Sequence, residues 1–219
     1  MKNNINKYKI YGRSKGRKKN NFDLDKKIVN NIVSKKIILN KKQFNILDIG
    51  SGSGESTLYL SKIYPKSNIV ACENFIDGNQ NLIYEIIKNK KNNIKIYNGN
   101  VLEFFDKNQI IDVFDLVWIL FPDPWPKKRH FKRRLINKNF MEKLNKILKK
   151  NGRVHIVSDS SSYLRQIFLN VFEFKSNFLW ENQSKTSWDF DKHKLPETKF
   201  YKKAIKFDRK PIYIILRKL

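Results

Sequence analysis

The spacing of apolar runs along the chain constrains its fold more than any other feature. From Phe44 onward, short apolar runs of strand length alternate with longer amphipathic runs of helix length. Alternation of this kind is typical of an α/β protein whose mostly parallel sheet carries helices on both faces. The predicted strands are 45–49, 68–73, 94–97, 113–120 and 153–158, and the predicted helices are 55–63, 77–89, 102–105, 137–149 and 161–172.

Two more strand-like runs close the chain, at 178–180 and 211–216, and they bring the predicted sheet to seven strands. No good helix pattern separates them, so we expect them to pair as an antiparallel hairpin at the sheet edge. The stretch 183–200 between them contains Trp188, His193 and Pro196 and is predicted to be a long loop. Long loops in compact domains are often functional.

The length and charge of the chain indicate one domain and a polyanionic partner. A chain of 219 residues suits one α/β domain, which we place at 26–219. Residues 1–25 are predicted to form a flexible basic arm, because 2–21 contains no acid and buries too little apolar surface to fold alone. The formal net charge of +26 favours nucleic acid as the partner. The abundance of Lys, Asn and Ile also fits an AT-rich genome, which weakens the argument from charge.

Cysteine usage and hydropathy exclude several classes of protein. Cys72 is the only cysteine, so the chain has no intramolecular disulfide and no cysteine-based zinc site. Its apolar neighbours predict a buried core residue. No apolar run approaches the roughly 20 residues that cross a membrane, and the N-terminus lacks a signal-peptide core. We therefore expect a cytoplasmic protein without a membrane partner.

A glycine-rich loop follows the first predicted strand. Its glycines, Gly50, Gly52 and Gly54, follow a G-x-G-x-G pattern, whereas a dinucleotide-binding loop has G-x-G-x-x-G. Glycines let the backbone turn tightly and approach a ligand, and the following helix N-terminus favours polar groups. Asp48 precedes the loop; its charge would repel a pyrophosphate but suits the ammonium group of S-adenosylmethionine.

Two further polar residues end neighbouring strands. Glu73 ends the second predicted strand, where a carboxylate can accept the ribose hydroxyls, and Asn100 follows the third, near the expected adenine edge. The carboxyl ends of parallel strands form the rim where open α/β sheets bind ligands. The loop, Glu73 and Asn100 together predict a Rossmann-like class I S-adenosylmethionine-dependent methyltransferase. An NAD-dependent enzyme is the nearest alternative, and the glycine spacing disfavours it.

The segment 121–134 follows the fourth predicted strand and contains the most distinctive chemistry. Asp123 lies between two prolines that restrict the turn around it. Trp125 is either a stacking surface for a base or a core aromatic beneath the turn. Residues 127–134 include six Lys or Arg, which suit phosphate groups. These parts can hold and modify a base in RNA or DNA.

With these motifs the chain closely resembles the bacterial tRNA (guanine-N7-)-methyltransferases, the TrmB family. The resemblance extends from about residue 44 to the C-terminus; 121–134 is its most specific part, and the glycine loop, Glu73, Ser158-Asp159 and 198–200 support it. It implies methyl transfer from S-adenosylmethionine to N7 of a guanine in the variable loop of tRNA. It also implies a monomer or homodimer that needs no metal and no obligatory protein partner.

The resemblance also implies roles for individual residues. Lys127 would contact the substrate, and Asp159 would complete the guanine pocket together with Thr198, Lys199 and Tyr201. Guanine N7 carries no proton, so the reaction needs no general base and depends on alignment of N7 with the methyl group. We therefore interpret Asp123, the catalytic and cofactor-contacting candidate, as a positioning group that stabilises positive charge in the purine.

Three positions depart from the pattern of the family. The chain has Asp48 where the family usually has Glu, and Asn100 where it usually has Asp. Tyr201 replaces the Glu of the Thr-x-Phe-Glu motif, which leaves open how the last loop holds guanine. Two alternatives remain: a methyltransferase for an exocyclic amine of RNA or DNA, and a catalytically inactive RNA-binding homologue. The single proline between Asp123 and Trp125 disfavours the first, and the intact glycine loop disfavours the second.

The three histidines add little to this interpretation. His130 either contacts phosphate or caps the following helix, and we favour the cap. His155 lies within a predicted strand and is expected to be a core residue with a hydrogen-bonded ring. His193 carries no prediction.

Overall fold

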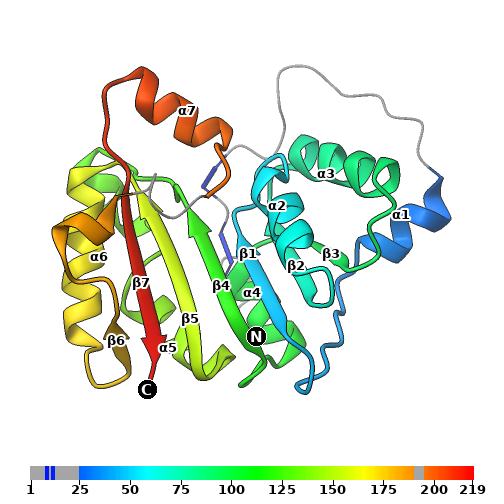
Figure 1. Ribbon diagram of the computed structural model, residues 1–219, viewed down its shortest axis with the longest axis horizontal. Coiled ribbons are helices and arrows are strands. Elements are labelled where there is room, and N and C mark those ends of the chain that lie inside the picture. The colour runs from blue at the N-terminus through cyan, green and yellow to red at the C-terminus, as the bar shows by residue number, and fades with distance from the viewer. Residues whose placement is uncertain (1–7, 10, 13–24, 190–194) are drawn as a thin grey trace, which may run out of the picture.

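The computed structural model describes residues 8–9, 11–12, 25–189 and 195–219 (Figure 1). Within these residues, seven strands form one sheet in the order β3-β2-β1-β4-β5-β7-β6. The first five strands pair in parallel, and β7 is antiparallel to both of its neighbours. The predicted seven-stranded, mostly parallel sheet is therefore confirmed. Its strands are β1 Asn45–Ile49, β2 Asn68–Glu73, β3 Ile94–Asn98, β4 Phe114–Leu120, β5 Leu148–Ser158, β6 Phe178–Trp180 and β7 Ile212–Lys218.

Helices cover both faces of the sheet, as the alternating pattern predicts (Figure 1). One face packs against α4 (Val101–Asn108), α5 (Lys138–Ile147) and α6 (Ser161–Glu173). The opposite face packs against α1 (Lys26–Ile32), α2 (Glu55–Ile63), α3 (Ile76–Lys88) and α7 (Lys199–Lys206). Two short 3₁₀ helices, η1 (Lys128–Arg133) and η2 (Lys185–Trp188), complete the described elements.

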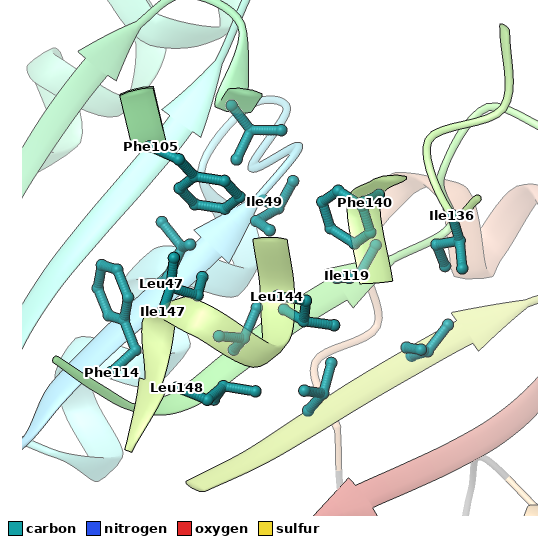
Figure 2. Close-up of a cluster of buried hydrophobic side chains, with 14 of the residues drawn as sticks. Leu47, Ile49, Phe105, Phe114, Ile119, Ile136, Phe140, Leu144, Ile147 and Leu148 are labelled. Atoms are coloured by element: carbon teal, nitrogen blue, oxygen red, sulfur yellow. The ribbon is translucent and has the colours of Figure 1, made fainter. Parts of the chain in front are cut away.

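The core forms because side chains of each central strand alternate between the two faces. Leu47 and Ile49 of β1 belong to the cluster beneath α4 and α5, whereas Ile46 belongs to the cluster beneath α2 and α3. Figure 2 shows the first cluster, in which Phe105, Phe140 and the residues around them close over β1 and β4. Burial of this kind contributes about 25 cal/mol for each Å² of apolar surface removed from water.

The boundaries of the predicted strands and helices lie within two residues of the observed ones except at α4, which ends at Asn108 and not at residue 105, and at β5. The β5 strand begins at Leu148, five residues before the predicted start, because α5 ends at Ile147 and the chain passes directly into the sheet. An irregularity in the β4–β5 pairing between Phe114 and Leu116 accommodates this early start, and Asn151 there has a left-handed backbone with φ of 63°. The helices α1 and η1 were not predicted.

The prediction of a long loop at 183–200 and of no helix between the last two strands is wrong. η2 lies in this stretch, and α7 begins at Lys199, with the Thr198 Oγ1 accepting a hydrogen bond from the Tyr201 N–H as an N-cap. Four lysines in the eight residues of α7 conceal its apolar stripe, and only Ala204 is fully buried. The antiparallel pairing of β6 with β7 is confirmed, but a long connection that contains η2 and α7 joins them in place of a hairpin turn.

Most of the predicted arm 1–25, and His193, lie outside the described residues. Of the arm, Tyr8 donates a hydrogen bond from its hydroxyl to Asp106 Oδ2 at 2.7 Å. Tyr11 and Gly12 lie beside the turn that follows β4. Among the helices described, none is long and apolar enough to span a membrane.

Candidate active site

The carboxyl ends of the parallel strands bring most of the predicted site residues to one rim of the sheet. The Gly50 N–H donates to the Cys72 carbonyl at 2.8 Å, and the Gly99 N–H donates to the Glu73 carbonyl at 3.0 Å. On the other side of β1, the Phe121 N–H donates to the Val157 carbonyl at 2.9 Å. The loops after β1, β2, β3, β4 and β5 are therefore neighbours, as the parallel topology requires.

The glycine loop turns in a conformation that favours glycine at each of its three predicted positions. Gly50, Gly52 and Gly54 have φ of 74°, 56° and 92°. A Cβ atom added at Gly50 would meet nothing within 4 Å, so the backbone there is open to a ligand. A Cβ atom added at Gly54 would lie 2.5 Å from the Leu82 side chain, so this glycine is needed for packing of the loop on α3.

A fourth glycine, Gly78, supports the glycine loop, and the sequence did not predict this role. A Cβ atom added at Gly78 would lie 2.1 Å from the Gly52 carbonyl oxygen. The first turn of α3 therefore touches the backbone of the glycine loop directly. A glycine two residues into a predicted helix is a weak signal of such an approach.

Glu73 holds the glycine loop through its carboxylate. Its Oε2 accepts from the Gly52 N–H at 2.9 Å, and its Oε1 accepts from the N–H groups of Asn74 and Phe75 at 2.6 and 2.9 Å. A carboxylate has about four acceptor positions, so one remains for a ribose hydroxyl beyond these three bonds. Glu73 thus sets the shape of the loop and keeps a place for the predicted ligand contact.

Asp48 is buried behind the glycine loop, with 1 % of its surface exposed. The hydroxyls of Ser56 and Thr57, in the first turn of α2, both donate to its Oδ2 at 2.6 Å. Burial raises the pKa of Asp48 to about 6, the two hydroxyls oppose this shift, and the charge of Glu73 adds to it. An ionised Asp48 is therefore costly without a cation, and an ammonium group beside it would offset that cost.

Asn100 caps α4. Its side-chain Oδ1 accepts from the Leu102 N–H at 2.8 Å, which satisfies one of the unpaired N–H groups at the start of the helix. The cap uses the side-chain oxygen, which an Asp at this position would also supply. The side-chain amide adds donors that a carboxylate lacks.

Asp123 lies on a strained turn between β4 and η1. Phe121 and Trp125 have backbone φ angles of 52° and 41°, in the left-handed region that residues other than glycine rarely adopt. Asp123 is on the surface of this turn, and desolvation by the protein packed around its carboxyl group raises its pKa. Strain of this kind clusters at functional sites, where the surrounding structure holds it.

Groups of the same chain surround Trp125. Its ring meets Tyr11 edge-on at 6.3 Å between centroids and His130 edge-on at 5.8 Å, and the Arg133 guanidinium lies 5.0 Å from its centroid. A Cβ atom added at Gly12 would lie 3.5 Å from Asp123 Oδ2. Trp125 is half-buried, so it is neither a core residue nor a freely exposed platform.

The helix α7 lies over the glycine loop, and Figure 1 shows it at the rim where β4 and β5 end. The Lys199 N–H donates to Glu55 Oε2 at 2.8 Å, and the Phe200 ring lies 4.0 Å from the Cβ position of Gly52. Tyr201 is half-buried against the apolar cluster beneath α7. The N-terminus of α7, which carries the predicted substrate residues Thr198, Lys199 and Tyr201, is therefore tethered through Glu55 to the start of α2, directly after the glycine loop. Glu55 was not predicted as a site residue.

Asp159, after β5, forms an ion pair with Arg209, with 3.2 Å between Oδ2 and Nη1. Arg209 follows α7, so this pair is a second connection between α7 and the rim of the sheet. Lys127, Lys128, Arg129 and Lys132 are exposed on the segment after Asp123, as a phosphate-binding role requires.

Arg134 does not belong to this phosphate-binding patch, and the prediction that included it is wrong. Only 1 % of Arg134 is exposed, and its guanidinium donates hydrogen bonds inside the protein. His130 is part of η1 and packs on Trp125, so the predicted helix cap is also wrong. The hydrogen-bonded ring predicted for His155 is confirmed, since its Nδ1 lies 2.6 Å from the Tyr213 hydroxyl, but the residue is half-buried and does not belong to the core.

The residues at the rim fit S-adenosylmethionine. Three positive-φ glycines expose backbone, Asp48 is a buried carboxylate in need of a cation, and Glu73 has acceptor capacity for a ribose. The buried hydroxyl of Ser51 has no hydrogen-bond partner among the described residues, so it is available for a hydrogen bond to a ligand. No cluster of His, Cys, Asp or Glu in the described part of the chain is arranged to hold a metal ion.

Comparison with known proteins agrees with this geometry. A family model described as "Putative methyltransferase" matches residues 42–213. A tRNA (guanine-N(7)-)-methyltransferase of Buchnera aphidicola subsp. Schizaphis graminum is 34% identical over 174 residues, which cover 80% of this chain and 72% of the relative. The chain belongs to the tRNA (guanine-N7-)-methyltransferase family. A second family member, from Bartonella quintana, is 30% identical over 77% of this chain and 72% of its own length.

Membership of this family makes the chain a methyltransferase that uses S-adenosylmethionine. Solved structures support the fold. The 30S ribosomal A1408 methyltransferase from an uncultured bacterium superposes with a TM-score of 0.55 at 19% identity, over 86% of this chain and 98% of that one. The predicted class I Rossmann-like fold and the predicted cofactor are both confirmed.

Proposed function

We propose that the protein transfers the methyl group of S-adenosylmethionine to N7 of a guanine in the variable loop of tRNA. The observation that supports this most is the place of Asp123. It stands on a strained turn directly after β4, next to the strand that leads into the glycine loop. The names of the family members supply the base and the atom.

The cofactor is held by Asp48, Gly50, Gly52, Gly54, Glu73, Asn100 and Asp123. When bound, it supplies a sulfonium-activated methyl group. Asp48 would face its ammonium group, Glu73 would accept a ribose hydroxyl through its remaining acceptor position, and Asn100 would contact the adenine. These residues lie at strand ends of the sheet, so their relative positions are set by the pairing of β1, β2 and β3.

The chain's own residues then orient the guanine. The in-plane lone pair of N7 would have to point at the sulfonium methyl group, opposite the C–S bond that breaks, so alignment supplies most of the catalysis and no proton is abstracted at N7. Asp123 holds the base and stabilises the positive charge that enters the purine ring. Lys127 and Asp159 contact the substrate, together with the α7 terminus formed by Thr198, Lys199 and Tyr201.

Two groups of cations belong to the elements that carry this site. The first consists of the exposed residues of η1, which follows the Asp123 turn, and the second consists of the lysines of α7. We assign both to the phosphate backbone of tRNA, with an affinity that falls steeply as salt rises. The protein acts in the cytoplasm as a monomer or homodimer, without an obligatory protein partner and without a metal.

The experiment that tests this function measures methyl transfer from labelled S-adenosylmethionine to unmodified tRNA transcripts, followed by nucleoside analysis. We expect 7-methylguanosine, which disappears when the variable-loop guanine is replaced and when Asp123 is changed to Ala. The control is Asp112→Asn, at an exposed acid at the far end of the sheet that pairs with Lys218; Asn tolerates the left-handed backbone of this residue, with φ of 47°. A different methylated nucleoside, or no product although cofactor and tRNA both bind, would refute the proposal.

A further inference from the structure

Arg134 is an internal connector, and nothing in its sequence context distinguishes it from the exposed cations before it. Its Nε–H donates to the Pro124 carbonyl at 2.8 Å. Its Nη1 donates to the Ser162 carbonyl and to Gln166 Oε1 at 3.0 and 3.1 Å, and its Nη2 donates to the Ser162 hydroxyl at 2.8 Å. Its guanidinium also stacks on Phe131, 3.6 Å from the ring centroid.

This environment is unusual for a buried cation. All four acceptors that the structure gives the guanidinium are neutral, and burial lowers the pKa of Arg134. A buried charge without a carboxylate partner is a costly way to stabilise a fold. A fixed fork of five N–H donors is, in contrast, well suited to holding several groups in one geometry.

The group that Arg134 holds is the turn that presents Asp123. Pro122, Pro124 and Pro126 have no N–H, and the turn contains the left-handed residues Phe121 and Trp125. Among the described residues, the backbone–backbone hydrogen bonds outside regular elements include none to 122–126. The Arg134 bond to the Pro124 carbonyl therefore fixes the backbone one residue after Asp123.

The other end of the guanidinium holds the loop after β5. Ser162 lies in the first turn of α6, three residues after Asp159. The Gln166 side chain continues the connection, because its Nε2 donates to the Ile136 carbonyl at 3.0 Å. Arg134 thus joins the two loops that carry Asp123 and Asp159.

We propose that Arg134 is a positioning residue that sets the distance between the Asp123 turn and the Asp159 loop, and so shapes the pocket for the guanine base. This inference rests on the proposed function. It predicts that loss of the guanidinium fork slows the chemical step, whereas loss of a phosphate contact would weaken tRNA binding. Because only 1 % of Arg134 is exposed, it could contact a phosphate group only if the protein unfolded locally.

The test compares Arg134→Lys and Arg134→Gln with Arg165→Gln, a control on the exposed face of α6. The kcat and KM for tRNA and the Kd for S-adenosylmethionine are measured at a temperature where circular dichroism shows each variant folded. We expect kcat to fall about tenfold or more in both Arg134 variants, since a buried charged hydrogen-bond network is lost. We expect KM and Kd to change less than about threefold, and the control to match the wild type.

A second pair of variants keeps the test decisive if Arg134 cannot be replaced without unfolding. Ser162→Ala and Gln166→Met each remove one neutral partner and leave the cation in place. A fall in kcat of about threefold or more in either variant, with KM unchanged, supports the inference. An unchanged kcat in both, or a loss that appears only in KM, overturns it. Absence of 7-methylguanosine with the wild-type protein would instead refute the proposed function.

Discussion

The most informative perturbation is Asp48→Asn, because the structure predicts opposite effects on folding and on cofactor binding. Burial raises the pKa of Asp48 from its ordinary value of 3.8 to about 6. A pKa raised this far means that keeping Asp48 ionised in the folded protein costs about 3 kcal/mol. A neutral Asn at the same place avoids this cost.

The pH dependence follows from the sign of the shift. Between about pH 4 and pH 6 the folded protein holds a proton on Asp48 that the unfolded chain has released. The wild-type free energy of unfolding therefore falls as pH rises through this window. Relative to the wild type, Asp48→Asn should gain about 3 kcal/mol of stability between pH 4 and pH 7. For a chain of this length that is a relative gain in Tm of about 6–12 °C.

Cofactor binding should respond in the opposite direction. Only the ionised carboxylate attracts the ammonium group, so the wild-type Kd for S-adenosylmethionine should rise about tenfold between pH 7 and pH 5. The variant should bind weakly at both pH values, without this dependence. Calorimetric titration measures the Kd, and thermal unfolding at several pH values measures the stability.

The control for both measurements is Asp112→Asn, the same chemical change at an exposed acid. It should alter neither the pH profile of stability nor the Kd. A stability difference between Asp48→Asn and wild type that was the same at pH 4 and pH 7 would show that folding does not raise the pKa of Asp48. A wild-type Kd that was independent of pH in this window would contradict the predicted attraction between Asp48 and the ammonium group.

Three further changes test other parts of the site. Gly78→Ala places a methyl group 2.1 Å from the Gly52 carbonyl and should weaken S-adenosylmethionine binding about tenfold or more, measured as Kd; an unchanged Kd would mean that the loop shifts without cost. Glu55→Ala removes the acceptor of the Lys199 N–H and should raise KM for tRNA about threefold to tenfold with the cofactor Kd unchanged, whereas a change in Kd alone would contradict a tether role. Lys127→Gln should lower tRNA affinity and reduce the slope of log K against log salt by about one, which filter binding at several salt concentrations measures; an unchanged slope would remove Lys127 from the phosphate contacts.

The strands and the loops at their carboxyl ends could be predicted from the sequence, because the residue patterns that define them are local. An apolar strand followed by glycines, as at β1, defines both the element and the end that binds the ligand. The glycine positions, Glu73 and Asn100 all follow from that alternation and its topology. The N-cap role of Asn100 was not predicted, although a polar residue before an apolar helix is a local pattern.

The parts that could not be predicted depend on contacts between distant segments. Arg134 has the same neighbours in sequence as the exposed cations before it, and only the packing of η1 against α6 buries it. Gly78 matters because α3 touches the glycine loop, and Glu55 matters because α7 returns to α2. The helix α7 itself was missed because its lysines hide a narrow apolar stripe.

The two halves of the site are therefore held in different ways. The proposed cofactor half lies at strand ends of one sheet, where ladders of backbone hydrogen bonds fix Asp48 and Glu73 and the starts of the loops that carry the other residues. The proposed substrate half lies on the turn of Asp123 and on α7, which are held by Arg134, Glu55 and the Asp159–Arg209 pair. Changes to these connectors should thus alter how tRNA is positioned while S-adenosylmethionine still binds. A connector variant that lost cofactor affinity as strongly as kcat would show that the two halves are one cooperative unit.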